Sequence, residues 1–191
     1  MLDQIEVKQK TGNEPLIFQE KEIGIKLEDF WKWSVSDILS NVTRGRFAEF
    51  IVATALNVDP KTVRDEWGAY DLTSPEGIKI EVKSASYLQS WKQNKLSEIS
   101  FYVKKTLKPD EAAKYSGFPS LWADVYVFCL LKHEDKKTVD PLNLDQWEFF
   151  VLSKHEIENC KYNSITLKSL KTLAEGVPYG SLREKIINHD K

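Results

Sequence analysis

Residues 69–83 read AYDLTSPEGIKIEVK, and this stretch decides the fold. Residues 74–77 (SPEG) have the composition of a tight turn, with proline fixing φ at the second position and glycine at the fourth. After the turn, residues 78–83 alternate apolar and charged side chains, which is the pattern of a half-buried strand. We therefore predict an antiparallel hairpin between strands 69–73 and 78–83, with a charged face.

Three charged residues of this hairpin form the candidate site. Asp71 and Glu81 belong to neighbouring strands, and Lys83 shares the face of Glu81. Two close carboxylates repel each other and are normally tolerated around a hard cation such as Mg²⁺ or Mn²⁺. A metal held in this way assists phosphodiester hydrolysis, and Lys83 would position the water or stabilise phosphate charge. The alternative is that Glu81 and Lys83 are ordinary solvated strand residues and that Asp71 begins a turn.

The helix expected before the hairpin contains an acid in an apolar setting. It is predicted over about residues 44–57, with Thr43 as the N-cap, and most of it should be buried nearly all round. Within it, Glu49 is costly to bury unless it is paired or bound to a cation. Two explanations are open: a metal-related role, or an ion pair with Arg44 or Arg46 at a helix end.

The remaining apolar segments predict the rest of an α/β fold. Strands are expected over residues 99–103, 123–131 and 147–152, and the second of these (ADVYVFCLL) is apolar enough to be a central strand covered on both faces. Together with the hairpin, they predict a mixed sheet of about five strands flanked by helices.

Further helices are predicted at both ends of the chain. Helical spacing of apolar residues extends from 28 to 39. Capping-box spacing at Ser153 with Glu156, and at Ser181 with Glu184, predicts helices that begin at residues 154 and 182. Two classes of explanation apply to Trp31, Trp33 and Trp91: we expect core packing, and the alternative is an exposed ring that stacks on an unpaired base.

Length and composition favour one ordinary folded domain. The 191 residues suit a single domain over 1–191, with a core at about 28–152 and a C-terminal helical extension over 153–191. Hydrophobic residues make up 41% and charged residues 29%, which excludes a wholly disordered or fibrous chain. No apolar stretch approaches the roughly 20 residues of a membrane span, and the N-terminus lacks the apolar core of a secretory signal, so we expect a cytoplasmic protein.

Charge is distributed unevenly along a chain whose formal net charge is −2. Residues 79–108 have a net charge of +5, whereas residues 1–30 have a net charge of −3. A positive region around the candidate site suits the steering of phosphate groups. The alternative is that these lysines simply solvate a surface.

The hairpin motif resembles that of a known superfamily. Asp71, nine intervening residues and then Glu81, Val82 and Lys83 are similar to the D-(X)n-(D/E)-X-K signature of the PD-(D/E)XK, or restriction-endonuclease-like, nucleases. Glu49 fits the helix acid of that superfamily, although Tyr70 stands where a proline usually precedes the aspartate. The resemblance covers about residues 43–132.

This resemblance implies a restriction-endonuclease-like core and a Mg²⁺-dependent endonuclease acting on DNA, with Mn²⁺ able to substitute. The implied catalytic residues are Asp71, Glu81, Lys83 and Glu49, and the implied metal ligands are Asp71, Glu81, Glu49 and the backbone carbonyl of Val82. The continuation of the strand suggests substrate contacts by Ser84, Ser86 and Gln89, which are otherwise ordinary polar loop residues. Specific double-strand cleavage would favour a homodimer. The alternative function is a non-catalytic module of nuclease fold that binds nucleic acid or a protein partner.

Overall fold

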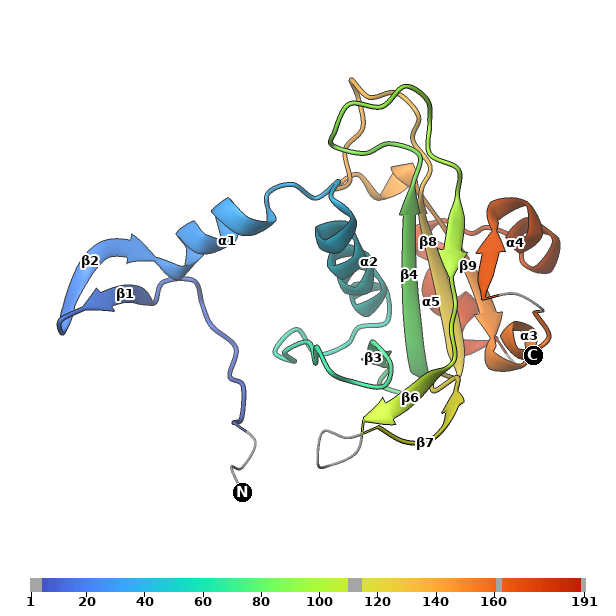
Figure 1. Ribbon diagram of the computed structural model, residues 1–191, viewed down its shortest axis with the longest axis horizontal. Coiled ribbons are helices and arrows are strands. Elements are labelled where there is room, and N and C mark those ends of the chain that lie inside the picture. The colour runs from blue at the N-terminus through green and yellow to red at the C-terminus, as the bar shows by residue number, and fades with distance from the viewer. Residues whose placement is uncertain (1–4, 110–114, 161–162, 190–191) are drawn as a thin grey trace.

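The computed structural model describes residues 5–109, 115–160 and 163–189 (Figure 1). Its centre is a mixed four-stranded sheet in the order β3-β4-β8-β9, in which β4 and β8 run parallel and the two outer pairs run antiparallel. The sheet consists of β3 (Leu72–Thr73), β4 (Lys79–Ser86), β8 (Val125–Leu131) and β9 (Trp147–Ser153). The predicted α/β class, a mixed sheet flanked by helices, is confirmed.

Alternation along β4 determines which side chains each face of the sheet receives. Ile80 and Val82 are buried in the core cluster that includes α2 (Asn41–Ala55). Because successive side chains of a strand point to opposite faces, Glu81 and Lys83 project to the other face. The predicted charged face of this strand is therefore present, and both charged residues are half-buried.

Helices α2 and α5 (Tyr179–Ile187) cover the first face of the sheet. Ala48 and Val52 of α2 and Leu182 and Ile186 of α5 are fully or almost fully buried against it. The expected burial of this helix nearly all round is wrong, because Arg46, Phe50 and Thr54 are exposed and form an outer face. Helix α5, from the expected C-terminal extension, thus contributes to the main core.

The second face of the sheet is covered by β5 (Ser100–Tyr102), β10 (Ser164–Thr166), α3 (Lys154–Glu158) and α4 (Leu167–Leu173), which pack around a second apolar cluster. The fifth predicted strand does form, as β5, but it pairs antiparallel with β10. This pairing is why the main sheet has four strands. The ladder of β6 (Thr106–Pro109) with β7 (Tyr115–Ser120) and the short 3-10 helix η1 (Leu144–Gln146) complete the described connections.

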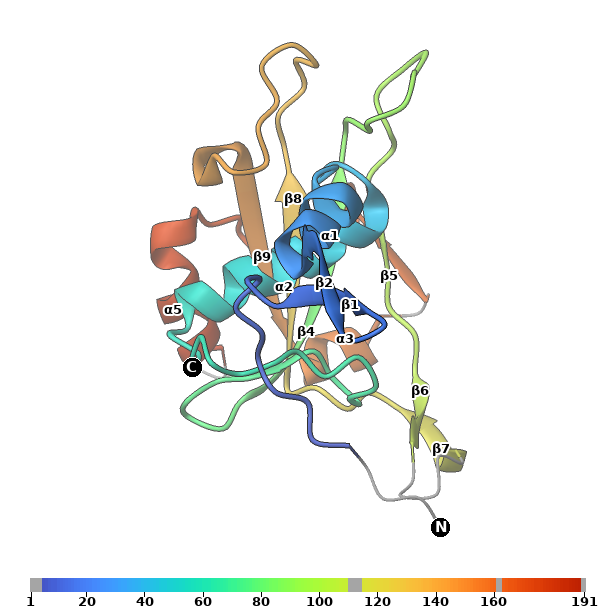
Figure 2. The same ribbon diagram turned by 90° about the vertical axis from the view of Figure 1, so that its left-hand side faces the viewer.

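The first part of the chain forms a projecting unit, residues 11–35, which we call the N-terminal arm. It consists of the hairpin β1 (Pro15–Phe18) and β2 (Lys21–Lys26), followed by α1 (Leu27–Val35). The arm lies beyond α2 on the side away from the sheet, and Figure 2 views the molecule from the arm. The helix predicted over 28–39 is present as α1, but it ends four residues earlier, at Val35.

The preferred core packing of three tryptophans is wrong. Trp31 and Trp33 of the arm are exposed by 38% and 84%, and Trp91 is exposed by 53%. Both arm tryptophans belong to α1, which has no buried residue.

Two of the predicted helix starts differ from the structure, and one is confirmed. Helix α2 begins after Ser40 instead of Thr43, and the Arg44 N–H donates to the Ser40 carbonyl at 2.8 Å. Helix α5 begins after Pro178, so Ser181 lies inside the first turn instead of at the N-cap. The capping box at Ser153 is present as predicted, and α3 begins at residue 154.

The strand predicted over 69–73 is paired only at Leu72–Thr73, with Ile80 and Lys79 opposite. No helix among the described residues is long and apolar enough to cross a membrane.

Candidate active site

Two backbone contacts hold Asp71 against β4 just before β3 begins. The Asp71 N–H donates to the Ile80 carbonyl at 3.0 Å, and the Val82 N–H donates to Asp71 Oδ2 at 2.7 Å. The carboxylate is therefore fixed at the edge of β4 by the same hairpin that the turn residues predict. Glu81 lies on β4 between Ile80 and Val82, the two residues to which Asp71 is hydrogen-bonded.

Glu81 and Lys83 form an ion pair on the second face of the sheet. Both side chains line a cavity of about 170 Å³. The aromatic residues Tyr102, Trp122 and Tyr126 line the same cavity, together with Lys104. An acid and a base of the predicted site thus share a hollow with aromatic and cationic side chains.

Burial and nearby negative charge disfavour the anionic form of Asp71. Burial, and after it the negative charges of Glu81 and Glu49, raise the pKa of its carboxyl to about 7. The Val82 N–H and the Lys83 ammonium oppose this rise, but they do not cancel it. A buried acid whose anionic form is disfavoured in this way is stabilised by a proton or by a bound cation.

Glu49 is buried and forms an ion pair with a residue that the sequence did not indicate. Arg64, in the loop after α2, donates to both oxygens of Glu49, at 3.1 Å from Nη2, and also contacts Glu66 at 2.6 Å. An ion pair at Glu49 was one of the two expectations, but the partners Arg44 and Arg46 were wrong. The hydrogen bonds that Arg64 donates to Glu49 raise the pKa of Arg64, with a smaller contribution from Asp71, so the guanidinium stays charged near both acids.

The donors fit Mg²⁺ only as a site that is completed by water and substrate. Among the described residues, no group of three or more His, Cys, Asp or Glu side chains is arranged to hold a metal ion. Mg²⁺ is commonly bound by one or two carboxylates, with waters and phosphate oxygens as its other ligands. The repulsion between Asp71 and Glu81 is the observation that fits such a cation. Val82 pairs with Val127 in the ladder with β8, and metal binding by its carbonyl stays a prediction.

The three predicted substrate-binding residues lie at the far end of β4 and beyond it. Ser84 Oγ accepts from Arg44 Nε at 3.3 Å, and Gln89 Oε1 accepts from Arg44 Nη1 at 3.4 Å. Gln89 and Ser86 are buried, and Gln89 Nε2 donates to the Ser86 carbonyl at 3.3 Å. Ser84 and Gln89 thus bind Arg44 through neutral oxygens, and Ser86 contacts Gln89.

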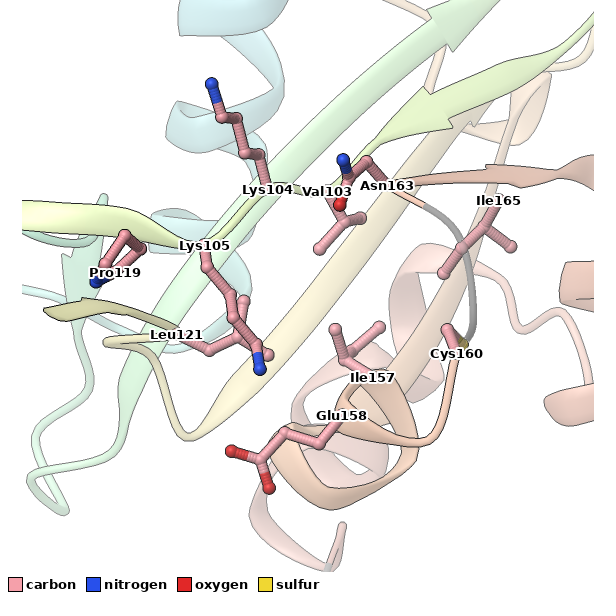
Figure 3. Close-up of a pocket in the computed structure, with 10 residues that line it drawn as sticks. All are labelled: Val103, Lys104, Lys105, Pro119, Leu121, Ile157, Glu158, Cys160, Asn163 and Ile165. Carbon is pink, nitrogen blue, oxygen red and sulfur yellow. The ribbon is translucent and has the colours of Figure 1, made fainter.

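A larger cavity of about 410 Å³ adjoins the first one (Figure 3). The two cavities share Val103, Lys104 and Leu121 in their walls. Lys104 and Lys105 project in different directions from the segment after β5. Part of the predicted positive region therefore borders the candidate site, while the side chain of Lys108 lies outside the described residues.

The fold and the site together define an α/β protein with two acids and a lysine on a sheet-edge hairpin, an arrangement suited to phosphodiester hydrolysis. A family model for bacteriophage T4 endonuclease IV matches residues 19–169, and the chain belongs to that family. It is therefore a member of an endonuclease family. No curated protein matches the chain.

Several residues of the site were not indicated by the sequence. Arg64 lies in a polar segment with no periodic pattern, and its pairing with Glu49 depends on how the loop folds back over α2. Trp122 and Tyr126 reach the cavity from beyond the hairpin, at the start of β8. Tyr126 stands at an alternating position within an apolar run, and this was the one available signal that it faces the side of Glu81.

Proposed function

We propose that this protein is a Mg²⁺-dependent endonuclease of the PD-(D/E)XK type that hydrolyses phosphodiester bonds of DNA. The observation that carries the proposal is the juxtaposition of Asp71 and Glu81 beside Lys83, with the pKa of Asp71 raised by burial and by the neighbouring negative charges. Membership of an endonuclease family supports the same reaction class.

Asp71 and Glu81 are the proposed ligands of Mg²⁺, for which Mn²⁺ substitutes. The metal, when bound, supplies an activated water and neutralises charge on the phosphate. Asp71 is held for this role by the Val82 N–H, which keeps one carboxylate oxygen fixed at 2.7 Å. Lys83, placed in the cavity wall by its pairing with Glu81, stabilises the charge that develops on the phosphate oxygens.

Glu49 is proposed to support the site, and the structure suggests an indirect route for that support. Its two oxygens accept from Arg64, so direct metal binding would require the arginine to leave. With the pair intact, Glu49 holds a guanidinium near Asp71, and guanidinium groups bind phosphate well. Arg64 is thus a second candidate phosphate contact.

The DNA strand is proposed to continue from the catalytic residues along the segment after β5. Lys104 borders both cavities and Lys105 borders the larger one, so phosphates on either side of the scissile bond would meet positive charge there. Ser84 is half-buried and remains a proposed substrate contact. For Ser86 and Gln89 the same role would require them to give up internal hydrogen bonds.

The first experiment is cleavage of supercoiled and single-stranded DNA in Mg²⁺ or Mn²⁺ by the wild type, Asp71→Asn and Lys83→Ala. Matched controls are Asp145→Asn, which changes an exposed acid within η1, and Lys171→Ala, which removes an exposed lysine paired with Glu148 at 3.8 Å. We expect the wild type and both controls to cut, EDTA to stop them, and the two site variants to fail.

Two results would contradict the proposal. Cleavage that persists in EDTA would show that the reaction does not depend on a divalent metal. DNA binding without cleavage by any folded preparation, and without Mn²⁺ binding by calorimetry, would favour the non-catalytic binding module instead.

A further inference from the structure

We propose that the N-terminal arm is a dimerisation surface that binds the same arm of a second copy of this chain. The arm is internally well connected: the Leu27 and Glu28 N–H groups donate to the carbonyls of Glu14 and Gly12, both at 2.9 Å. A Cβ on Gly12 would lie 2.8 Å from the Trp31 ring, so this glycine, at φ +91°, lets the chain pack closely on α1. The arm is therefore an ordered unit with a fixed surface.

The hairpin of the arm exposes an apolar face. Phe18 pairs with Lys21, so its side chain lies on the face that also receives Ile23 and Ile25 by alternation along β2. All three apolar side chains are exposed, Phe18 by 66%. A two-stranded hairpin with an uncovered apolar face has little stability of its own in water.

Helix α1 is uncovered to a similar degree. It has nine residues and none of them is buried. Phe30 and Trp33, three residues apart, lie next to each other with ring centroids 6.5 Å apart, yet they are exposed by 52% and 84%. A helix this short is marginal alone in water and is normally stabilised by packing of an apolar face.

The exposed apolar area is of the size that a stable dimer buries. Aromatic side chains bury roughly 150–250 Å² each, so the exposed fractions of Phe18, Phe30 and Trp33 amount to roughly 300–500 Å². The aliphatic side chains bring the arm to on the order of 700 Å², close to the ~800 Å² that each partner contributes to a standard interface. They are Leu16, Ile17, Ile23, Ile25 and Val35. An exposed apolar area of this size on one small unit is unusual for a soluble monomer.

Charge favours a second copy over DNA as the occupant. Residues 15–35 contain three lysines and four acids, interspersed along the hairpin and α1. Such a mixture is self-complementary in a two-fold interface, because a lysine of one copy that contacts an acid of the second copy implies the same contact in reverse. A net negative arm would repel phosphates, in contrast to the lysine-rich cavity walls.

The test is the mass of the full chain in solution, by sedimentation equilibrium over a concentration series, for the wild type, Trp33→Lys and Phe18→Lys. We expect the wild type to reach twice 22.1 kDa and both arm variants to stay at 22.1 kDa. Leu142→Lys is the matched control, because it changes an equally apolar side chain, exposed by 63%, outside the arm, and it should dimerise like the wild type.

A second measurement keeps the result independent of folding and of catalysis. Ser34→Cys, which keeps Trp33 and places a thiol at the next position of α1, should form a disulfide-linked dimer on mild oxidation, and Asp71→Asn, inactive under the proposed function, should still dimerise. A wild type that stays monomeric at high concentration overturns the proposal. Quenching of tryptophan fluorescence by a single-stranded oligonucleotide that is lost in Trp33→Lys, with monomeric protein, would overturn it in favour of base stacking on the arm.

Discussion

The two halves of β4 both carry polar side chains, but their hydrogen bonds and charges are balanced in different ways. In the first half, Glu81 and Lys83 lie beside Asp71, whose pKa is raised to about 7 by burial and negative neighbours. In the second half, Ser84 lies beside the buried Arg44, whose guanidinium donates to Ser84, Gln89, Asn41 and the Leu39 carbonyl.

The difference separates a site from a structural contact. The cluster around Arg44 is closed, because four neutral acceptors surround its N–H groups and leave little for a ligand to improve. The cluster around Asp71 is open, since its excess negative charge is not neutralised by the described residues and a cation would relieve it. Polar residues that are satisfied by the protein hold the fold, and those that are not are available for chemistry.

The sharpest way to break this comparison is to remove Lys83. We expect Lys83→Ala to lower kcat for DNA cleavage by roughly 10²–10³-fold, as for loss of a donor that stabilises transition-state charge. Stability should change little, because the side chain is partly exposed and its pair with Glu81 lies at a cavity wall. Steady-state kinetics and a urea titration measure the two quantities. An unchanged kcat would show that Lys83 has no role in the chemical step.

The opposite result is expected at the closed cluster. Arg44→Ala should lower the free energy of unfolding by about 2–4 kcal/mol, because it leaves buried acceptors such as Gln89 Oε1 without a donor. Arg46→Ala, two residues further on α2, removes an exposed arginine 3.4 Å from Glu66 and should cost less than about 1 kcal/mol. Equal effects of the two substitutions in urea titrations would show that the Arg44 contacts are not what holds β4 to α2.

Much of the main sheet could be predicted from local patterns, and the comparison explains which parts could not. The alternation over 78–83 and the apolar run over 123–131 correspond to β4 and β8, because strand period and burial are local properties. The pairing of β5 with β10 joins segments about 60 residues apart, and no local signal specifies it. The helix predicted over 28–39 ends at Val35, where the arm joins the rest of the chain, and no local pattern marks that junction.

The candidate site was predictable to a similar extent. Asp71, Glu81 and Lys83 follow from one hairpin, so the sequence places them together. Glu49 was recognised as a buried acid, but its partner Arg64 lies in an irregular loop. Ser86 and Gln89 resembled accessible polar residues, and their burial depends on how residues after β4 fold back toward Arg44, which a single sequence does not reveal.

The pH dependence of stability sharpens the comparison at Asp71. In metal-free buffer with EDTA, the carboxyl of Asp71 has a pKa near its ordinary 3.8 in the unfolded chain and of about 7 in the folded protein. The folded state therefore binds more protons between these values, and the free energy of unfolding should fall as pH rises through this window. Between pH 5 and 7 the decrease should be about 2 kcal/mol.

Asp71→Asn removes the titrating carboxyl, so the free energy of unfolding of the variant should change little between pH 5 and 7. The variant should be more stable than the wild type at pH 7 in EDTA, although it is expected to be inactive. Asp145→Asn should keep the wild-type pH dependence. Urea titrations at several pH values measure all three proteins, and a wild-type curve that rises from pH 5 to 7 would show that Asp71 is stabilised as an anion within the protein.

The smallest expected effect concerns the lysines that border the cavities. Lys105→Ala should raise KM for DNA about threefold and leave kcat unchanged, because a phosphate contact away from the reacting atoms affects binding uniformly. The dependence of log affinity on log salt concentration should become shallower by about 1, the value for one lost phosphate contact. Lys171→Ala, with its lysine near Glu148, should leave both quantities unchanged. Equal salt dependence for the two variants would place the DNA path on another face. A change confined to Lys105→Ala would show that DNA contacts the segment after β5 as well as the site on β4.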